Sequence, residues 1–190
     1  EPNHAGNTGG ASAWTTFTPT EEGTAKLSTE NSDFDTVLAI YKVGTGSGWD
    51  ALEEVGSDDN GGEDGEDSEV VFNVEVGVTY LVAVDGAGGE TGTVQLNHEL
   101  SKTPVIDSVT ESADGLLNGT VTLEVSASSP LADAELTYQW RRDGNLVDGA
   151  SGATLTLENM QYTDAGDYTV EVSSFAGEVT SDDILVRVIQ

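Results

Sequence analysis

The chain has 190 residues, and its 35 Asp and Glu against 6 Lys and Arg give a formal net charge of −29 at pH 7. No basic stripe is present, so neither nucleic acid nor an anionic membrane surface is an expected partner. The lack of cysteine excludes disulfides and sulfur-ligated zinc. Because salt screens such self-repulsion, the composition favours a saline or calcium-rich setting.

No segment approaches the ~20 apolar residues of a membrane span, so membrane insertion is not expected. The sequence begins at Glu1 without a basic or apolar leader, which predicts a processed or excised chain. Short runs of alternating apolar and polar residues are separated by Gly, Asp, Asn and Ser, and no run has a helical period. The pattern therefore predicts an all-β protein.

In the first half, strands are expected at residues 13–18, 23–29, 36–42, 52–57, 69–74, 79–85 and 91–100. Their expected inward side chains are Trp14, Leu27, Val37, Ala39, Tyr41, Phe72, Tyr80, Val82 and Val84. The pattern breaks at residues 101–104, and Pro104 opens a new apolar run. This predicts two tandem β-sandwiches, at residues 1–102 and 103–190.

In the second half, strands are expected at residues 105–112, 119–128, 136–142, 153–158, 167–174 and 184–189. Parity in the last strand turns Ile184, Val186 and Val188 inward, and it leaves Leu185 and Ile189 outward. A free edge strand is normally blunted by charge, whereas these two residues are apolar. The last strand is therefore a candidate interface for strand addition between copies.

Three stretches of the second half share one pattern: residues 136–140 end in Trp140, residues 153–157 alternate, and residues 164–170 contain Tyr168 and Val170. They resemble bacterial relatives of the I-set immunoglobulin domains. The resemblance implies an immunoglobulin-like sandwich with Trp140 in the core and Tyr168 in a tyrosine corner. Val125 and Val170 occupy the two positions where vertebrate members have a disulfide.

The first half resembles the bacterial pre-peptidase C-terminal domains, which are jelly-roll-like sandwiches, at residues 1–3, 32–41 and 79–86. Some members of the wider group bind calcium through an acidic N-terminal segment, which makes Glu1 and Asn3 candidate Ca²⁺ ligands by resemblance. His4 departs from the acidic or amide residue frequent at that place. Calcium chemistry suits these groups because Ca²⁺ takes six to eight oxygen ligands from flexible loops.

Two further acidic stretches could hold an ion. Asp33 and Asp35 flank Phe34 before a strand, where they could ligate an ion or bond the turn backbone. The acidic loop 58–69 contains Asp58, Asp59 and Asn60. An EF-hand is not expected there, since its sixth position holds Glu63 instead of glycine; the alternative is a solvated hairpin tip.

No catalytic apparatus is expected. Nucleophilic hydrolysis needs a base beside the nucleophile, and the only histidines, His4 and His98, are predicted to be surface residues. Carboxylate pairs occur, but no aromatic-lined cleft accompanies them, because Trp14 and Trp140 are assigned to cores. Trp49 lies in a Gly/Ser hairpin loop, where it could be an exposed contact residue or a cap over the sandwich.

The sequence thus favours an extracellular, non-catalytic structural or adhesion protein of a bacterial surface, matrix or filament. Its expected partners are other copies of itself or other surface proteins, with glycan a weaker option that would use Trp49 and the acidic loop. The alternative is an accessory region of a secreted peptidase or other hydrolase, which both resemblances allow.

Overall fold

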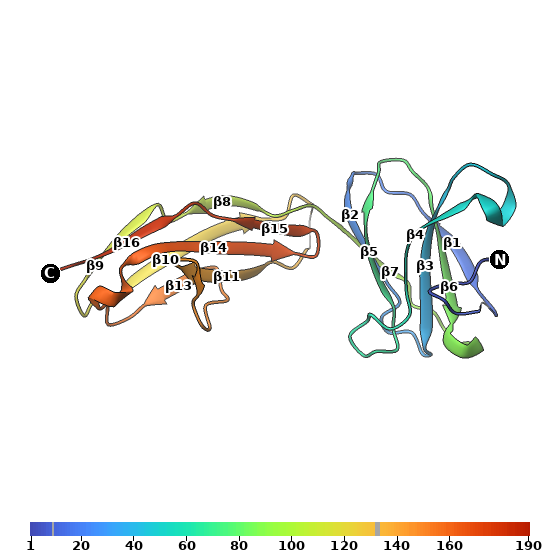
Figure 1. Cartoon of the computed structure of the whole chain (residues 1–190), viewed down its shortest axis with the longest axis horizontal. Helices are drawn as coiled ribbons and strands as arrows, with labels where there is room; N and C mark the ends of the chain where they lie inside the picture. Colours follow the sequence, from blue (N-terminus) through green and yellow to red (C-terminus); the bar gives the residue numbers. More distant parts are fainter. Residues whose placement is uncertain (9, 132–133) are drawn as a thin grey trace. The chain divides into compact units, whose positions relative to one another are not determined.

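The computed structural model describes residues 1–8, 10–131 and 134–190. The chain divides into two compact units, Glu1–Leu100 and Ser101–Gln190. Each unit consists of β-strands in facing layers, and the helical residues among those described form short 3₁₀ turns (Figure 1). The prediction of an all-β protein is confirmed.

The first unit is a sandwich of two sheets. The four-stranded sheet has the order β1 (Ala13–Phe17), β6 (Tyr80–Gly86), β3 (Thr36–Val43) and β4 (Leu52–Asp58), and the three-stranded sheet has the order β5 (Glu69–Val74), β2 (Gly23–Ser28) and β7 (Asn97–Ser101). Both sheets contribute to the core, which contains Ala25, Leu27, Leu38, Ile40, Val70, Phe72, Val74, Tyr80, Val82 and Val84.

Strand β3 is buried on both faces, and this corrects the predicted inward set. Leu38 and Ile40 enter the core between the sheets, whereas Ala39 and Tyr41 belong to a second cluster with Ala83 on the opposite face. Trp14 packs on this second cluster, so it lies outside the main core. Parity misassigned the faces because residues 37–41 are all apolar and either alternation fits a sandwich.

The connections of the first unit also differ in part from expectation. Strands β3 and β4 form the expected hairpin, whose loop contains a turn of 3₁₀-helix, η1 (Gly48–Ala51). Strands β4 and β5 belong to different sheets. The acidic loop between them therefore crosses from one sheet to the other, and the hairpin-tip alternative is wrong. Another 3₁₀ turn, η2 (Ala87–Gly89), follows β6.

The second unit is an immunoglobulin-like sandwich. One sheet has the order β13 (Thr154–Leu157), β10 (Val121–Ser128) and β8 (Val105–Val109). The other has the order β12 (Asn145–Leu146), β11 (Thr137–Arg142), β14 (Gly166–Ser174), β16 (Ile184–Ile189) and β9 (Ser112–Leu116), with β15 (Gly177–Thr180) also paired to β14. Strands β9, β12 and β15 are not among the predicted strands; β9 runs parallel to β16.

The core of the second unit is as the sequence predicted. Trp140 and Val170 are completely buried, and Val125 is 6% exposed. The Trp140 indole nitrogen donates a hydrogen bond to the Gly152 carbonyl at 2.9 Å. Trp140 is therefore a large side chain at the centre of the apolar cluster, and its one polar atom is hydrogen-bonded.

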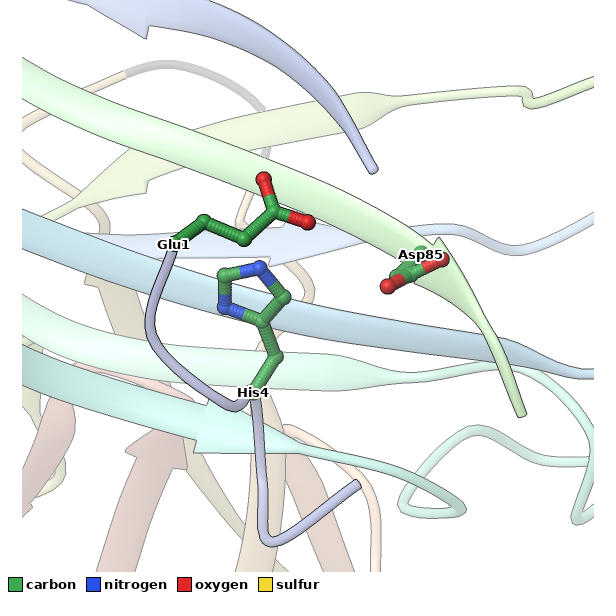
Figure 2. A group of neighbouring side chains, drawn as sticks. All are labelled: Glu1, His4 and Asp85. Atoms are coloured by element: carbon green, nitrogen blue, oxygen red, sulfur yellow. The ribbon is translucent and has the colours of Figure 1, made fainter. Parts of the chain in front are cut away.

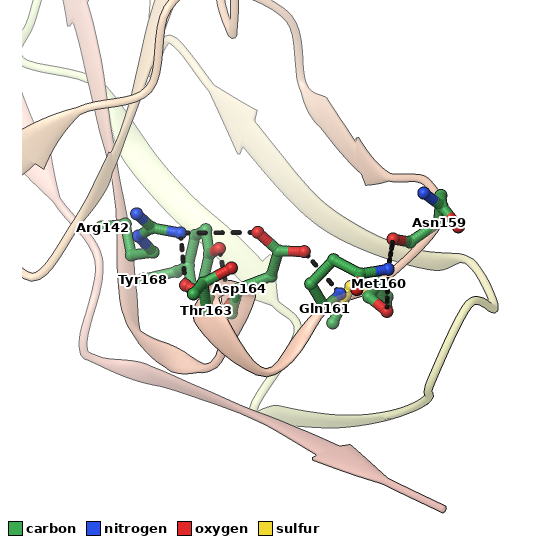
Figure 3. Close-up of polar contacts among 7 residues, drawn as sticks. All are labelled: Arg142, Asn159, Met160, Gln161, Thr163, Asp164 and Tyr168. Carbon is green, nitrogen blue, oxygen red and sulfur yellow. Dashed lines mark hydrogen bonds and ion pairs between the residues drawn. The ribbon is translucent and has the colours of Figure 1, made fainter.

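Tyr168 forms the predicted tyrosine corner. Its hydroxyl donates to the Asp164 carbonyl oxygen at 2.9 Å, and Asp164 ends the 3₁₀ turn η3 (Tyr162–Asp164). Figure 3 shows Arg142 beside this corner, where it donates to the Thr163 carbonyl and lies 3.6 Å from the Asp164 carboxylate. The Asp164 carboxylate in turn accepts from the Gln161 amide at 2.7 Å. The corner therefore ties η3 to β14 and β11.

The last strand does not form the free edge that the sequence suggested. Strand β16 lies between β14, which pairs with residues 184–186, and β9, which pairs with residues 185–189. The predicted side-chain parity is correct, because Leu185 and Ile189 are 43% and 46% exposed. They lie on the outer surface of the sheet, which leaves association through this face open but not strand addition to β16.

Candidate functional site

The N-terminal segment folds back on itself before β1. The His4 and Asn7 backbones exchange two hydrogen bonds, of 3.2 and 2.7 Å, around Ala5 and Gly6. Both central residues have positive φ, 45° and 81°, as a type I′ turn requires. Glycine adopts this conformation without cost, whereas Ala5 does so with some strain. The turn fixes the His4 backbone above the second face of β3.

Glu1, His4 and Asp85 form a compact group at the end of β6. One potential ligand atom from each side chain lies within 4.8 Å of the other two. His4 is completely buried, and its Nδ1 is 2.8 Å from the Tyr41 hydroxyl. Its Nε2 is buried and has no hydrogen-bond partner among the described residues. Figure 2 shows this nitrogen turned toward the Glu1 carboxylate, with Asp85 beside the ring.

Backbone amides hold Asp85 in its ionised form. Burial alone would raise the pKa of this carboxyl, but amide N–H groups and the nearby His4 together lower it. Oδ2 accepts from Gly10 at 2.9 Å, and Oδ1 accepts from Ala11 at 3.1 Å and from Gly86 at 2.9 Å. The carboxylate thus anchors residues 10–11 and presents a fixed negative charge beside His4.

Glu1 contributes a second carboxylate. Its Oε2 accepts hydrogen bonds from the Ser12 hydroxyl at 2.6 Å and from the Trp14 indole at 3.4 Å. The Ser12 bond is the largest cause of a lowered Glu1 pKa.

Tyr41, the hydrogen-bond partner of His4, is neutral at physiological pH. Burial, followed by the charges of Glu54 and Glu1, raises the pKa of its phenol to about 12.

Aromatic rings enclose the group on one side. The His4 ring centre lies 5.4 Å from that of Trp14 and 5.8 Å from that of Tyr41. Trp49 packs on Trp14 at 5.3 Å and is 54% exposed. Trp49 thus covers Trp14 and is also exposed, so the two alternatives predicted for it, a cap and an exposed contact residue, are compatible.

A second acidic group contains Asp35 and Asp59. Each has one carboxylate oxygen, Oδ1, that is buried without a hydrogen-bond partner among the described residues. Burial raises the pKa of Asp35, and the negative charges of Asp59, Glu90 and Asp64 raise it further. Glu90 is in direct contact, since its Oε2 accepts from the Asp35 amide at 3.3 Å. Asp35 and Asp59 are thus half-buried carboxylates close enough for their charges to interact, with the exposed Glu90 and Asp64 nearby.

The other acidic candidates mainly bond the backbone. Asp33 accepts from the Thr93 amide at 2.6 Å. Asp58 accepts from the Gly61 and Glu69 amides at 2.7 and 2.9 Å, which fixes both ends of the acidic loop. The remaining two candidates, Asn3 and Asn60, are exposed and join neither group. Asp67, within the acidic loop, is buried and accepts from the Asn31 amide at 3.0 Å.

Of the predicted ligands, Glu1 lies in a group with His4 and Asp85, which were not predicted, and Asp35 lies near Asp59. The prediction that His4 is a surface residue is wrong, because the N-terminal turn inserts it against β3; His98 is exposed as expected. Sequence reasoning also missed Asp85, Asp64 and Glu90. The apolar run at 37–41 was a usable signal, since a strand buried on both faces needs a cover.

No helix in the described part of the chain is long and apolar enough to cross a membrane. No family model and no curated protein matches the sequence.

Immunoglobulin domains are among the solved structures that match the chain. Titin domain M7 is 22% identical, with 48% of this chain and 99% of that chain covered and a TM-score of 0.42. The N-terminal Ig1-2 module of the Drosophila receptor protein tyrosine phosphatase DLAR is 14% identical, with 93% and 99% covered and a TM-score of 0.42. The human B7-H4 IgV-like domain is 14% identical, with 45% and 95% covered and a TM-score of 0.33. Likeness at these values assigns neither a function nor a family to the chain.

Proposed function

We propose that the chain is a non-catalytic extracellular structural or adhesion module whose first sandwich binds Ca²⁺ at Asp35 and Asp59. The observation that carries the proposal is the pair of buried, unpartnered carboxylate oxygens on these two residues. A buried charged oxygen without a partner is costly, and a calcium ion supplies the missing partner to both.

Two further negative charges lie near Asp35. Glu90 lies against the Asp35 backbone, and the charge of Asp64 is close enough to raise the Asp35 pKa. Oxygen donors with several negative charges are what Ca²⁺ prefers. Bound calcium would join the acidic loop, which carries Asp59, to the residue that precedes β3. The ion would therefore stiffen one end of the sandwich, which suits a structural or adhesive module.

Asp35→Asn combined with Asp59→Asn is expected to reverse the order of stability with and without calcium. In chelator the double variant should unfold at a higher temperature than the native chain, because repulsion is removed. At a Ca²⁺ concentration of about 100 times its dissociation constant, the native chain gains about 2.7 kcal/mol and the variant gains little. Thermal unfolding in EDTA and in CaCl₂ measures both effects.

The control removes two exposed charges elsewhere in the first unit, through Asp50→Asn with Glu22→Gln. It should keep the full response to calcium.

The pH dependence gives a second check. The pKa of Asp35 is raised in the folded chain, so in chelator the ionised carboxylate destabilises the fold at pH values above the folded-state pKa. This destabilisation disappears as the pH falls below the pKa of Asp35 in the unfolded chain. Equal unfolding temperatures of the native chain in EDTA and in CaCl₂ would remove the site.

The outer face of the second unit is the proposed surface for self-association. Leu185 and Ile189 on β16 are exposed, and Leu116, which is the register partner of Ile189 on β9, is 59% exposed. The ion pair between Arg187 and Asp114, at 2.8 Å, lies between them on the same two strands. A small apolar patch with paired charges suits a second copy of the same face.

Leu185→Glu with Ile189→Glu is expected to abolish self-association. Sedimentation velocity at increasing protein concentration measures it, in high salt so that the charge of −29 is screened. The matched control is Val76→Glu, which replaces a 59% exposed apolar residue of the first unit. A native chain that stays monomeric at every concentration would refute this part of the proposal.

A further inference from the structure

We propose that Glu1, His4 and Asp85 form a site for a divalent transition-metal ion of the zinc class, which fastens the N-terminal segment to the end of β6. This inference goes beyond the proposed function and uses different residues from the calcium site. It rests on one unexplained atom, the buried Nε2 of His4, and on the two carboxylates gathered around it.

The unpartnered Nε2 atom of His4 is available to bind a metal. A neutral imidazole has one N–H and one lone pair, and Nδ1 already has the Tyr41 hydroxyl as partner at 2.8 Å. If Nδ1–H donates to the phenol oxygen, Nε2 carries the lone pair that a metal requires. A metal-bound histidine usually has such a second hydrogen bond on its other nitrogen. The surroundings of His4 are thus those of a ligand, not of a core residue.

The two carboxylates complete a donor set of matching charge. Glu1 and Asp85 each bring one negative charge, and an imidazole that binds a metal does so in its neutral form, so the donor set would balance a divalent cation. Zinc-class ions bind nitrogen and oxygen at about 2.0 to 2.2 Å, which places their ligand atoms about 3.3 Å apart in a tetrahedron. The three atoms lie within 4.8 Å of one another, so small side-chain rotations close the distance.

The imidazole decides the class of metal. Ca²⁺ and Mg²⁺ take oxygen ligands, whereas imidazole suits zinc, copper, nickel and iron. Three protein ligands leave a position for water. The aromatic rings of Trp14 and Tyr41 cover one side of His4 and limit exchange with solvent.

A metal bound here would strengthen the attachment of the N-terminal segment to the first sandwich. The described residues of this segment, 1–8 and 10–12, are bonded to β3 and β6 by the His4 bond to Tyr41 and by the Asp85 bonds to Gly10 and Ala11. A metal bridging Glu1 and His4 to Asp85 would add a link between this segment and β6. The segment would then cover the second face of β3 more firmly with metal than without it.

The experiment titrates ZnCl₂ and CoCl₂ into the metal-free chain in a background of CaCl₂ and NaCl. We expect one ion per chain, with a change in Trp14 fluorescence and visible absorption from bound Co²⁺. Glu1→Gln and His4→Gln should each weaken binding by at least about tenfold, and Tyr41→Phe by about 10- to 100-fold. His98→Gln, at the exposed histidine, is the matched control and should bind as the native chain does.

Each outcome decides the question. Glu1 is exposed, so Glu1→Gln keeps the test valid even if His4→Gln fails to fold. Binding that survives both substitutions, or that is lost equally in His98→Gln, would overturn the site. If zinc does not bind, and an NMR titration shows that His4 is protonated between the two carboxylates, the group is an ion pair and the proposed metal site is refuted. Ca²⁺ binding that depends on His4 would overturn the metal class. Asp35→Asn with Asp59→Asn must leave the zinc response intact, which separates this test from that of the calcium site.

Discussion

Replacing Trp140 with Ala is expected to unfold the second unit under conditions where the first unit stays folded. Trp140 is completely buried in the cluster between the two sheets, and its indole nitrogen satisfies the Gly152 carbonyl. Truncating a buried tryptophan costs about 3 to 5 kcal/mol. This is a large part of the stability of about 5 to 15 kcal/mol that is typical of one domain. No disulfide can compensate in a chain without cysteine.

Calorimetry combined with near-UV circular dichroism measures the effect, because separate transitions report on the two units. Trp49→Ala is the matched control, since this tryptophan is 54% exposed and its ring packs mainly on Trp14. The control should cost about 0.5 to 1.5 kcal/mol, confined to the first unit. Similar losses from the two substitutions would contradict the assignment of Trp140 to the core.

Replacing Tyr168 with Phe is expected to destabilise the second unit by about 1 to 3 kcal/mol without changing its fold. The substitution removes only the hydroxyl, which donates to the Asp164 carbonyl at 2.9 Å. The ring, which is 1% exposed, remains in place. The carbonyl then loses its partner at the end of η3. Denaturant unfolding followed by far-UV circular dichroism measures the loss as a lower midpoint with an unchanged slope.

Tyr162→Phe provides the control within the same segment. Tyr162 is 56% exposed, and its hydroxyl accepts a hydrogen bond from the exposed Gln190 side chain at 3.1 Å. Water replaces this bond readily, so the control should shift the midpoint very little. A Tyr168→Phe variant as stable as this control would mean that the corner hydrogen bond contributes nothing to the fold.

The fold was more predictable than the site, and particular residues show why. Short alternating runs with turn residues between them marked most strands, and Trp140 with Tyr168 marked the second core. Strand β9 was not predicted because residues 112–116 have too few apolar side chains to show a clear alternation. Strand β15 was not predicted because it has only four residues. Their places are set by pairing with β16 and β14.

The candidate sites were only half predictable. Asp35 and Asp59 were named as ligands, but nothing local distinguished them from Asp33 and Asp58, which bond backbone amides instead. Which carboxylate oxygens remain buried and unpartnered depends on how the loops cross the end of the sandwich. A local pattern of acidic residues cannot contain that information.

The sequence by itself determined the all-β class, the side-chain parity of β16 and the central place of Trp140, because periodicity and residue size act locally. Tertiary structure alone decided which face of β3 meets the core and that β16 is an inner strand of its sheet. It also brought Glu1 and His4 to Asp85, about 80 residues away in the chain. Such contacts arise from long-range pairing, which balances chain entropy against burial over the whole unit.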